Sequence, residues 1–98
     1  MNLIALGINH NSAAVEVRER VAFAPEQVSE ALEDACEAGG LDEAVILSTC
    51  NRTELYAVVP EGQSLADKAC QLIDWIANYH HLSATELRQS AYHFEAEQ

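Results

Sequence analysis

Two short runs of β-prone residues, Ala44–Thr49 and Thr53–Val59, lie close together near the middle of the chain. Only Cys50, Asn51 and Arg52 separate them. A connection this short joins antiparallel neighbours, because parallel strands need a crossover of a dozen or more residues. The chain therefore contains a β-hairpin, and its turn carries a cysteine beside a basic residue.

The segments before the hairpin predict one strand and two helices. Leu3–Ile8 is an apolar run typical of a buried strand. Ser12 is the expected N-cap of a short helix over Ala13–Val21, and Phe23 is an expected core residue. A longer helix is predicted from Pro25, which suits a first helical turn, to Gly39-Gly40, which ends it.

The segments after the hairpin predict two more helices and a last strand. An amphipathic helix begins at Ser64, and its predicted apolar stripe consists of Leu65, Ala69, Leu72, Ile73 and Ile76. Ser83–Glu86 predicts a capping box for a short helix. Ala91–Phe94 is the expected final strand. The order is that of the ferredoxin-like split β-α-β pattern, β-α-β-β-α-β, an α+β fold with helices packed on an antiparallel sheet.

Size and charge restrict the classes of function. The 98 residues are expected to form one domain, residues 1–98, with a single modest core. The net charge is −11, with four arginines and one lysine, so the chain alone should bind nucleic acid poorly. No apolar run approaches the roughly 20 residues of a membrane helix, and Met1–Ala5 lacks the basic start of a signal peptide. We therefore expect a cytoplasmic protein that makes no membrane contact.

The remaining cysteines, histidines and glycines offer little competing chemistry. Three cysteines without a Cys-x-x-Cys spacing predict neither a disulfide framework nor a metal site. Cys36 and Cys70 fall on predicted helices beside core positions, and we expect both to be packing residues. His80 and His81 end a helix, where imidazoles suit the helix dipole. The four glycines form no dinucleotide or phosphate-binding motif.

Cys50 is the candidate nucleophile. The alternative is a small buried hydrophobe, which many free cysteines are, but the neighbours of Cys50 are polar and it falls at a turn. A free thiol is only about 3% thiolate at pH 7, and lowering its pKa increases its reactivity only severalfold, whereas positioning against a carbonyl contributes far more. Arg52 is therefore interpreted as a substrate anchor that binds a carboxylate through its planar fork. Its alternative is a surface arginine paired with Glu54.

Four further residues are candidates for supporting roles. Thr49 and Asn51 offer hydrogen bonds to a reacting carbonyl or amino group, and their alternative is turn capping. Glu54 either holds Arg52 in place or is a plain cross-strand charge. His10 follows the first strand and is expected at the same end of the sheet as the hairpin turn, or else it is an ordinary loop histidine.

Three stretches together resemble one known family. LGINH (Leu6–His10), VRERVAF (Val17–Phe23) and LSTCNRTELY (Leu47–Tyr56) closely resemble the N-terminal catalytic domain of the glutamyl-tRNA reductases, with the match in register along the chain. The Ser-Thr-Cys-Asn-Arg-Thr-Glu part is highly specific for that family.

The resemblance implies an activity and a set of roles. Family members reduce glutamyl-tRNA to glutamate-1-semialdehyde with NADPH, the first step of five-carbon tetrapyrrole (heme, porphyrin) synthesis. Cys50 matches the nucleophile that forms a thioester, and Thr49, Asn51 and Arg52 match the glutamate-binding stretch. The resemblance also implies a homodimer, the aminomutase that acts on glutamate-1-semialdehyde as pathway partner, and no metal.

The resemblance also implies what this chain lacks. The NADPH-binding and dimerisation domains of the family have no counterpart in it, and the family's assisting histidine lies beyond Gln98, so His93 receives no role. Two other readings remain open on the residues: a thiol-dependent hydrolase that uses Cys50 without NADPH, and a non-enzymatic ferredoxin-like binding or regulatory module.

Overall fold

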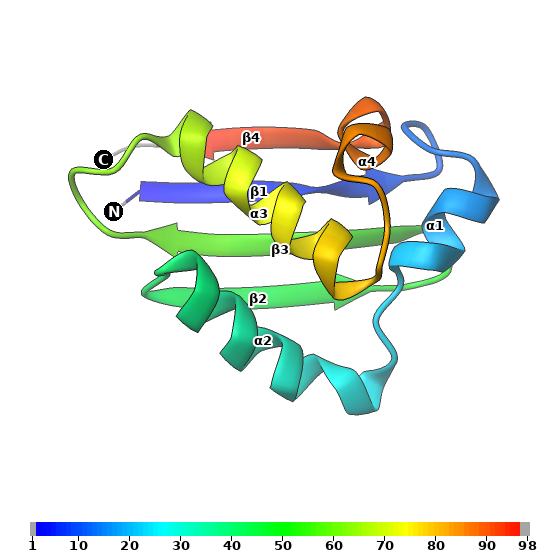
Figure 1. Ribbon diagram of the computed structural model, residues 1–98, viewed down its shortest axis with the longest axis horizontal. Coiled ribbons are helices and arrows are strands. Elements are labelled where there is room, and N and C mark those ends of the chain that lie inside the picture. Colours follow the sequence, from blue (N-terminus) through cyan, green and yellow to red (C-terminus); the bar gives the residue numbers. More distant parts are fainter. Residues whose placement is uncertain (1, 97–98) are drawn as a thin grey trace.

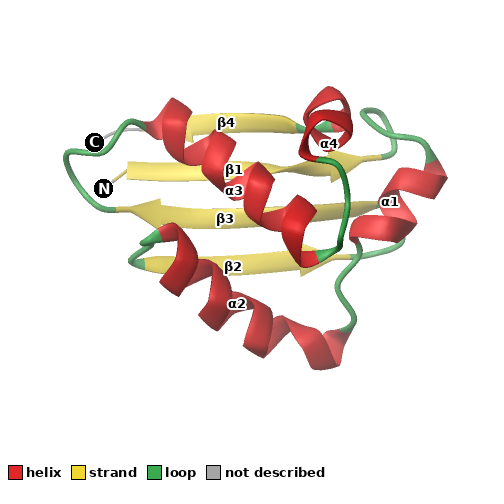
Figure 2. Ribbon diagram, in the orientation of Figure 1, coloured by secondary structure: helices red, strands yellow, loops and turns green. Residues whose placement is uncertain are grey.

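The computed structural model describes residues 2–96, and it consists of a four-stranded antiparallel sheet with helices on one face (Figure 1, Figure 2). Met1, residue 97 and Gln98, at the ends of the expected 1–98 domain, lie outside the described residues. The elements in chain order are β1 (Asn2–Asn9), α1 (Val15–Val21), α2 (Pro25–Gly39), β2 (Glu43–Ser48), β3 (Arg52–Val59), α3 (Leu65–Tyr79), α4 (Ala84–Ser90) and β4 (Tyr92–Ala96).

The strand order β2-β3-β1-β4 confirms the predicted split β-α-β arrangement. Strand β1 is central and pairs antiparallel with both β3 and β4. Its last residue, Asn9, lies opposite Arg52, the first residue of β3. The end of β1 and the β2–β3 turn therefore meet at one end of the sheet, the right-hand end in Figure 1, where α1 also lies.

The core lies between the sheet and the two long helices. Alternate residues of β1, Ile4, Leu6 and Ile8, are buried on the helix-facing side. The predicted stripe of α3 is buried throughout: Leu65, Ala69, Leu72, Ile73 and Ile76. Phe23 is confirmed as a core residue, with its ring stacked 6.1 Å from that of Trp75.

The other face of the sheet, here called the open face, is covered by no helix within residues 2–96. Strand alternation and cross-strand pairing assign five large, exposed apolar side chains to this face: Leu3, Val45, Leu47, Tyr56 and Phe94. No helix of the described residues is both long and apolar enough to cross a membrane.

Most of the predicted helix ends are confirmed. Ser64 and Ser83 are N-caps whose hydroxyls accept from the backbone N–H groups three residues later, at 3.2 and 3.3 Å. Pro25 begins α2, and Gly40 follows it with a left-handed φ of 63°.

Two local predictions are wrong. Ser12 does not cap α1, whose N-cap is Ala14. The Ser12 hydroxyl instead accepts from Asn9 N at 2.9 Å, so it belongs to the turn after β1. Cys70 is exposed rather than packed, because the helical step of about 100° per residue turns it away from the buried stripe of α3. Cys36 is partly buried against the core, as expected.

Candidate active site

The turn between β2 and β3 is built by Thr49. Its backbone N–H donates to the Arg52 carbonyl at 2.8 Å. Its hydroxyl oxygen accepts from the backbone N–H groups of Asn51 at 3.2 Å and of Arg52 at 3.3 Å. Thr49 therefore has the turn-capping role. Because both lone pairs of its hydroxyl oxygen accept backbone hydrogen bonds, the hydroxyl can interact with a ligand only by donating its proton.

The base of this turn is attached to the core. The Ser48 hydroxyl accepts from the backbone N–H of Phe23 at 2.9 Å and lies 3.0 Å from the hydroxyl of Thr53. Thr53 is only 4% exposed. These bonds tie the end of β2 and the start of β3 to the segment between α1 and α2, so the turn is presented by a fixed support.

Cys50 lies in this turn as an exposed free thiol. The alternative of a small buried hydrophobe is therefore wrong for Cys50. Asn51, beside it, is also exposed. The sequence-predicted trio Thr49, Cys50 and Asn51 thus forms a solvent-facing turn in which one residue holds the backbone and the next carries the thiol.

Arg52 and Glu54 form an ion pair on the open face of the sheet. Arg52 Nη1 lies 3.7 Å from Glu54 Oε1, and the arginine side chain is 46% exposed while that of Glu54 is 12% exposed. Both residues alternate with buried Thr53 and Leu55, which places them on the face away from the helices. The pairing that the sequence offered as the alternative for Arg52 is therefore present, and it leaves much of the guanidinium accessible to a ligand.

Two tyrosines that the sequence analysis did not single out complete the surroundings of Glu54. Tyr56 donates its hydroxyl proton to Glu54 Oε1 at 2.8 Å, and Tyr92 donates to Oε2. These bonds and the Arg52 charge lower the pKa of Glu54, although its burial acts in the opposite direction. Burial and the bond to Glu54 raise the pKa of Tyr92 to about 12.

The alternation of strand residues signals Tyr56, because Arg52, Glu54 and Tyr56 fall on the same face of β3. Nothing local signals Tyr92, which is 38 positions from Glu54. Their contact depends on the register of two strands against β1.

His10 is exposed and directly follows β1, at the end where Asn9 pairs with Arg52. The Asn9 side chain shapes this loop by accepting from the backbone N–H groups of Asn11 and Ser12 at 2.9 and 3.1 Å. The structure therefore brings His10 to the same end of the sheet as Cys50, as predicted. His93 is paired with Glu95 at 2.9 Å on β4, and its strand neighbour Leu6 faces the helices.

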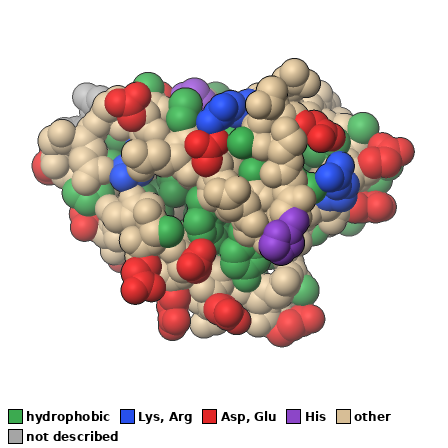
Figure 3. All heavy atoms as spheres, in the orientation of Figure 1, with side chains coloured by type: hydrophobic (Ala, Val, Ile, Leu, Met, Phe, Trp, Pro, Cys, Tyr) green, Lys and Arg blue, Asp and Glu red, His purple; other side chains and the backbone are tan. Residues whose placement is uncertain are grey.

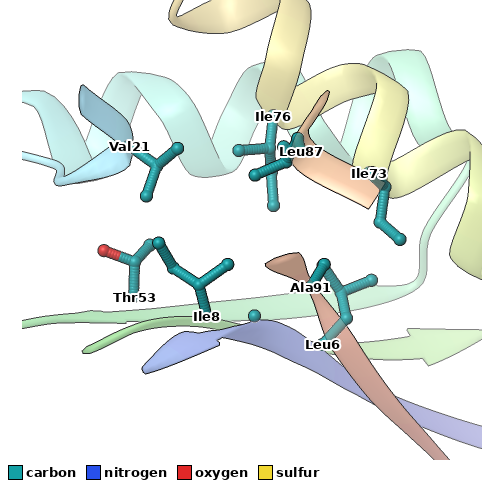
Figure 4. Close-up of a pocket in the computed structure, with 9 residues that line it drawn as sticks. Leu6, Ile8, Val21, Thr53, Ile73, Ile76, Leu87 and Ala91 are labelled. Carbon is teal, nitrogen blue, oxygen red and sulfur yellow. The ribbon is translucent and has the colours of Figure 1, made fainter. Parts of the chain in front are cut away.

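One small, partly open cavity under the helices is too small to be a substrate site. It lies between the sheet and the helices, and Figure 4 shows apolar side chains from both layers pointing into it. Its volume of about 10 Å³ barely holds one water molecule. Among the described residues, no group of three or more His, Cys, Asp or Glu is arranged to hold a metal ion. The exposed hairpin turn with Cys50 is the candidate site that the sequence and the geometry share.

Comparisons with known proteins find similar sequences and a similar fold within one family. The sequence model of the family described as "Glutamyl-tRNAGlu reductase, N-terminal domain" matches residues 6–98. Curated glutamyl-tRNA reductases from Pseudomonas syringae pv. syringae and Pseudomonas fluorescens (strain Pf0-1) are 56% and 55% identical over 92 residues, 94% of this chain and 20% of each relative.

A solved structure is similar over almost the whole chain. The glutamyl-tRNA reductase from Methanopyrus kandleri matches with a TM-score of 0.67 and 30% identity, covering 96% of this chain and 19% of that one. The chain thus spans about a fifth of the length of the relatives it matches.

Proposed function

The chain belongs to the glutamyl-tRNA reductase family, and from this premise we propose that it is the N-terminal catalytic domain of an enzyme that reduces glutamyl-tRNA to glutamate-1-semialdehyde, the first step of five-carbon tetrapyrrole synthesis. The observation that carries the proposal is the exposed thiol of Cys50 on a turn held by Thr49, two residues before an accessible guanidinium. In this proposal the chain supplies the nucleophile and part of the glutamate pocket.

The first chemical step is acyl transfer to Cys50. The thiolate attacks the carbonyl carbon of the glutamyl ester and forms a C–S bond. The intermediate collapses by breaking the C–O bond to the tRNA ribose, whose oxygen leaves with the electron pair and takes up a proton. The glutamyl group remains on the Cys50 sulfur as a thioester, and the tRNA is released.

The neighbouring residues bind and orient the glutamyl group. Arg52 has N–H groups beyond the one that faces Glu54, and a planar guanidinium binds a carboxylate well. We assign it the side-chain carboxylate of the substrate. The Thr49 hydroxyl proton and the exposed Asn51 amide are assigned to the reacting carbonyl and the amino group. His10 is assigned a supporting position at the edge of the site.

The residues of this chain do not fit a dinucleotide cofactor. Gly7 lies inside a strand, Gly39 and Gly40 end α2, and Gly62 lies in a loop, so no glycine-rich turn leads from a strand into a helix. We therefore assign NADPH binding to parts of the full-length enzyme outside this chain, and no hydride-transfer step to its residues. The homodimer and the partnership with the aminomutase are likewise proposed for the full-length enzyme.

Charge limits how this domain contributes to tRNA binding. The net charge is −11, and acidic side chains are spread over the helix-covered face (Figure 3). Such a face repels phosphates. We therefore assign most of the tRNA contact to other domains, with this domain approaching only the aminoacyl end at the hairpin turn. Three free cysteines suit a reducing compartment, and we propose a cytoplasmic location.

The test compares two cysteine variants of the full-length enzyme. Cys50→Ser should abolish NADPH-dependent aldehyde formation from glutamyl-tRNA and the acid-stable glutamyl adduct on the protein. Cys70→Ser, which alters another exposed thiol, should leave both unchanged. Aldehyde formation by Cys50→Ser at the wild-type rate would refute the proposal. Release of free glutamate that requires Cys50 and ignores NADPH would favour the hydrolase instead.

A further inference from the structure

Two tyrosines from different strands converge on one carboxylate beside the proposed site. Tyr56 lies on β3, and Tyr92 lies on β4 beyond the central strand β1. Their hydroxyls donate to Oε1 and Oε2 of Glu54, respectively. Because β1 carries Gly7 opposite both Glu54 and Tyr92, no side chain stands between them.

The Glu54 carboxylate is therefore fixed by hydrogen bonds and is not a free acceptor for a ligand. Oε1 faces the Tyr56 hydroxyl and Arg52 Nη1, and Oε2 faces the Tyr92 hydroxyl. The side chain is 12% exposed. A carboxylate with these donors on both oxygens has little capacity left for the ammonium group of a substrate, so its remaining action is on Arg52.

Orienting the Arg52 guanidinium before a ligand binds requires an immobile partner such as Glu54. Its side chain is 46% exposed at the start of β3, and an exposed arginine has many rotamers that are lost when it binds a ligand. A single exposed ion pair does not fix a long side chain strongly. A partner that is itself immobile reduces the rotamers of the guanidinium before the substrate arrives, which raises affinity without a new substrate contact.

We propose that Tyr92 and Tyr56 are positioning residues, which hold Glu54 so that Arg52 is presented in one orientation to the side-chain carboxylate of the glutamyl group. The two tyrosines thereby contribute to selectivity for a glutamyl over an uncharged acyl group, although neither touches the substrate. This inference rests on the proposed function, because it requires Arg52 to be the carboxylate anchor.

The experiment measures selectivity in the full-length enzyme. Cys50-dependent turnover of a small glutamyl ester and of the matching glutaminyl ester gives a ratio of kcat/KM values, and only the glutamyl ester carries the charge that Arg52 recognises. Tyr92→Phe and Tyr56→Phe should each lower this ratio about threefold to tenfold, the size of one net hydrogen bond. The rate with the glutaminyl ester should stay at the wild-type value.

Tyr79→Phe is the matched control, because Tyr79 lies on α3, where its ring packs against Phe23 and Trp75. Its ratio should equal that of the wild type. Equal losses with both esters in Tyr92→Phe would mean a merely structural role and would overturn the inference.

Arg52→Gln distinguishes a failure of the positioning role from a failure of the anchor assignment. If Arg52→Gln abolishes the selectivity and the tyrosine variants keep it, the anchor stands and the positioning role is refuted. If Arg52→Gln also keeps the selectivity, the anchor assignment fails and the inference fails with it.

Discussion

The hydroxyl of Tyr92 donates a hydrogen bond to Glu54 across an intervening strand, at the position of Gly7. Strands two apart in a sheet are separated by about 9.6 Å, twice the neighbour spacing. A long tyrosine and a glutamate span this distance only because the residue between them has no side chain. The network beside the proposed anchor therefore depends on a glycine in the middle of the sheet.

Gly7→Ala should strongly destabilise the protein. A Cβ at this position would lie 2.2 Å from the Thr53 carbonyl oxygen and 2.9 Å from the Glu54 Cα, so the backbone must shift. We expect the free energy of unfolding in urea to fall by about 3 kcal/mol, at the upper end of overpacking effects. Gly62→Ala is the control. A Cβ at Gly62 would meet no neighbouring atom, but the left-handed φ of 86° would cost an alanine about 1 kcal/mol of stability. Equal losses in the two variants would contradict the steric argument.

Tyr92 should be the last of the identified network tyrosines to ionise. Its pKa is raised from 10.0 to about 12 by burial and by the bond to Glu54. A raised folded-state pKa means that the contribution of Tyr92 to stability is complete below about pH 10 and is lost as the pH rises towards 12. Titration of tyrosinate absorbance should show a late step that Tyr92→Phe removes. A curve in which Tyr92→Phe removes an early step would disprove the assignment.

Glu54 should contribute to stability at neutral pH and lose this contribution in acid. Its pKa is lowered from 4.5, most strongly by the bond from Tyr92. A lowered folded-state pKa gives a contribution that is present above 4.5 and disappears as the pH falls through the folded-state value. Glu54→Gln should therefore be less stable than the wild type at pH 7, and the difference should narrow below about pH 4.5. Glu30→Gln, on the exposed side of α2, controls for the loss of one negative charge, and an identical profile for it would refute the specific role of Glu54.

The parts of the fold that local patterns determine were predictable. The hairpin followed from the short loop between Ala44–Thr49 and Thr53–Val59, and the buried stripe of α3 followed from helical spacing. The exposure of Cys50 and its nearness to Arg52 also followed, because both fall at that turn. Their functional roles stay predictions that the structure makes chemically reasonable.

The parts that depend on long-range register were not predictable. Tyr92 reaches Glu54 only because β4 pairs with β1 and β1 with β3 in one particular alignment. The predictions for Ser12 and Cys70 were wrong for local reasons. A small shift in where a helix begins changes which side chain caps it, as at Ser12. The angular position of a residue around the helix axis decides whether its side chain packs, as at Cys70.

Asp34→Ala should loosen the packing of α2 against α3. The indole N–H of Trp75 donates to Asp34 Oδ2 at 2.6 Å, and this is the single tryptophan of the chain. Loss of a hydrogen bond to a charged group at a partly exposed position should reduce the free energy of unfolding by about 1–2 kcal/mol. The tryptophan emission should change with it, because the indole loses its partner. Glu33→Ala on the same helix is the control, and an equal effect there would show that charge rather than the bond is responsible.

The three cysteines should differ in their rates of alkylation, and Cys36 should react most slowly. Cys50 and Cys70 are exposed, whereas Cys36 lies on α2 partly buried against the core. A neutral alkylating reagent reaches Cys36 freely only when α2 moves away from the core, so we expect its modification in the native protein, followed by mass spectrometry, to be about tenfold slower than that of the other two. Unfolding in urea should bring the three rates together, because the difference comes from packing. Loosening α2 by Asp34→Ala should raise the Cys36 rate alone. An unchanged Cys36 rate in that variant would mean that the bond from Trp75 does not hold this helix in place.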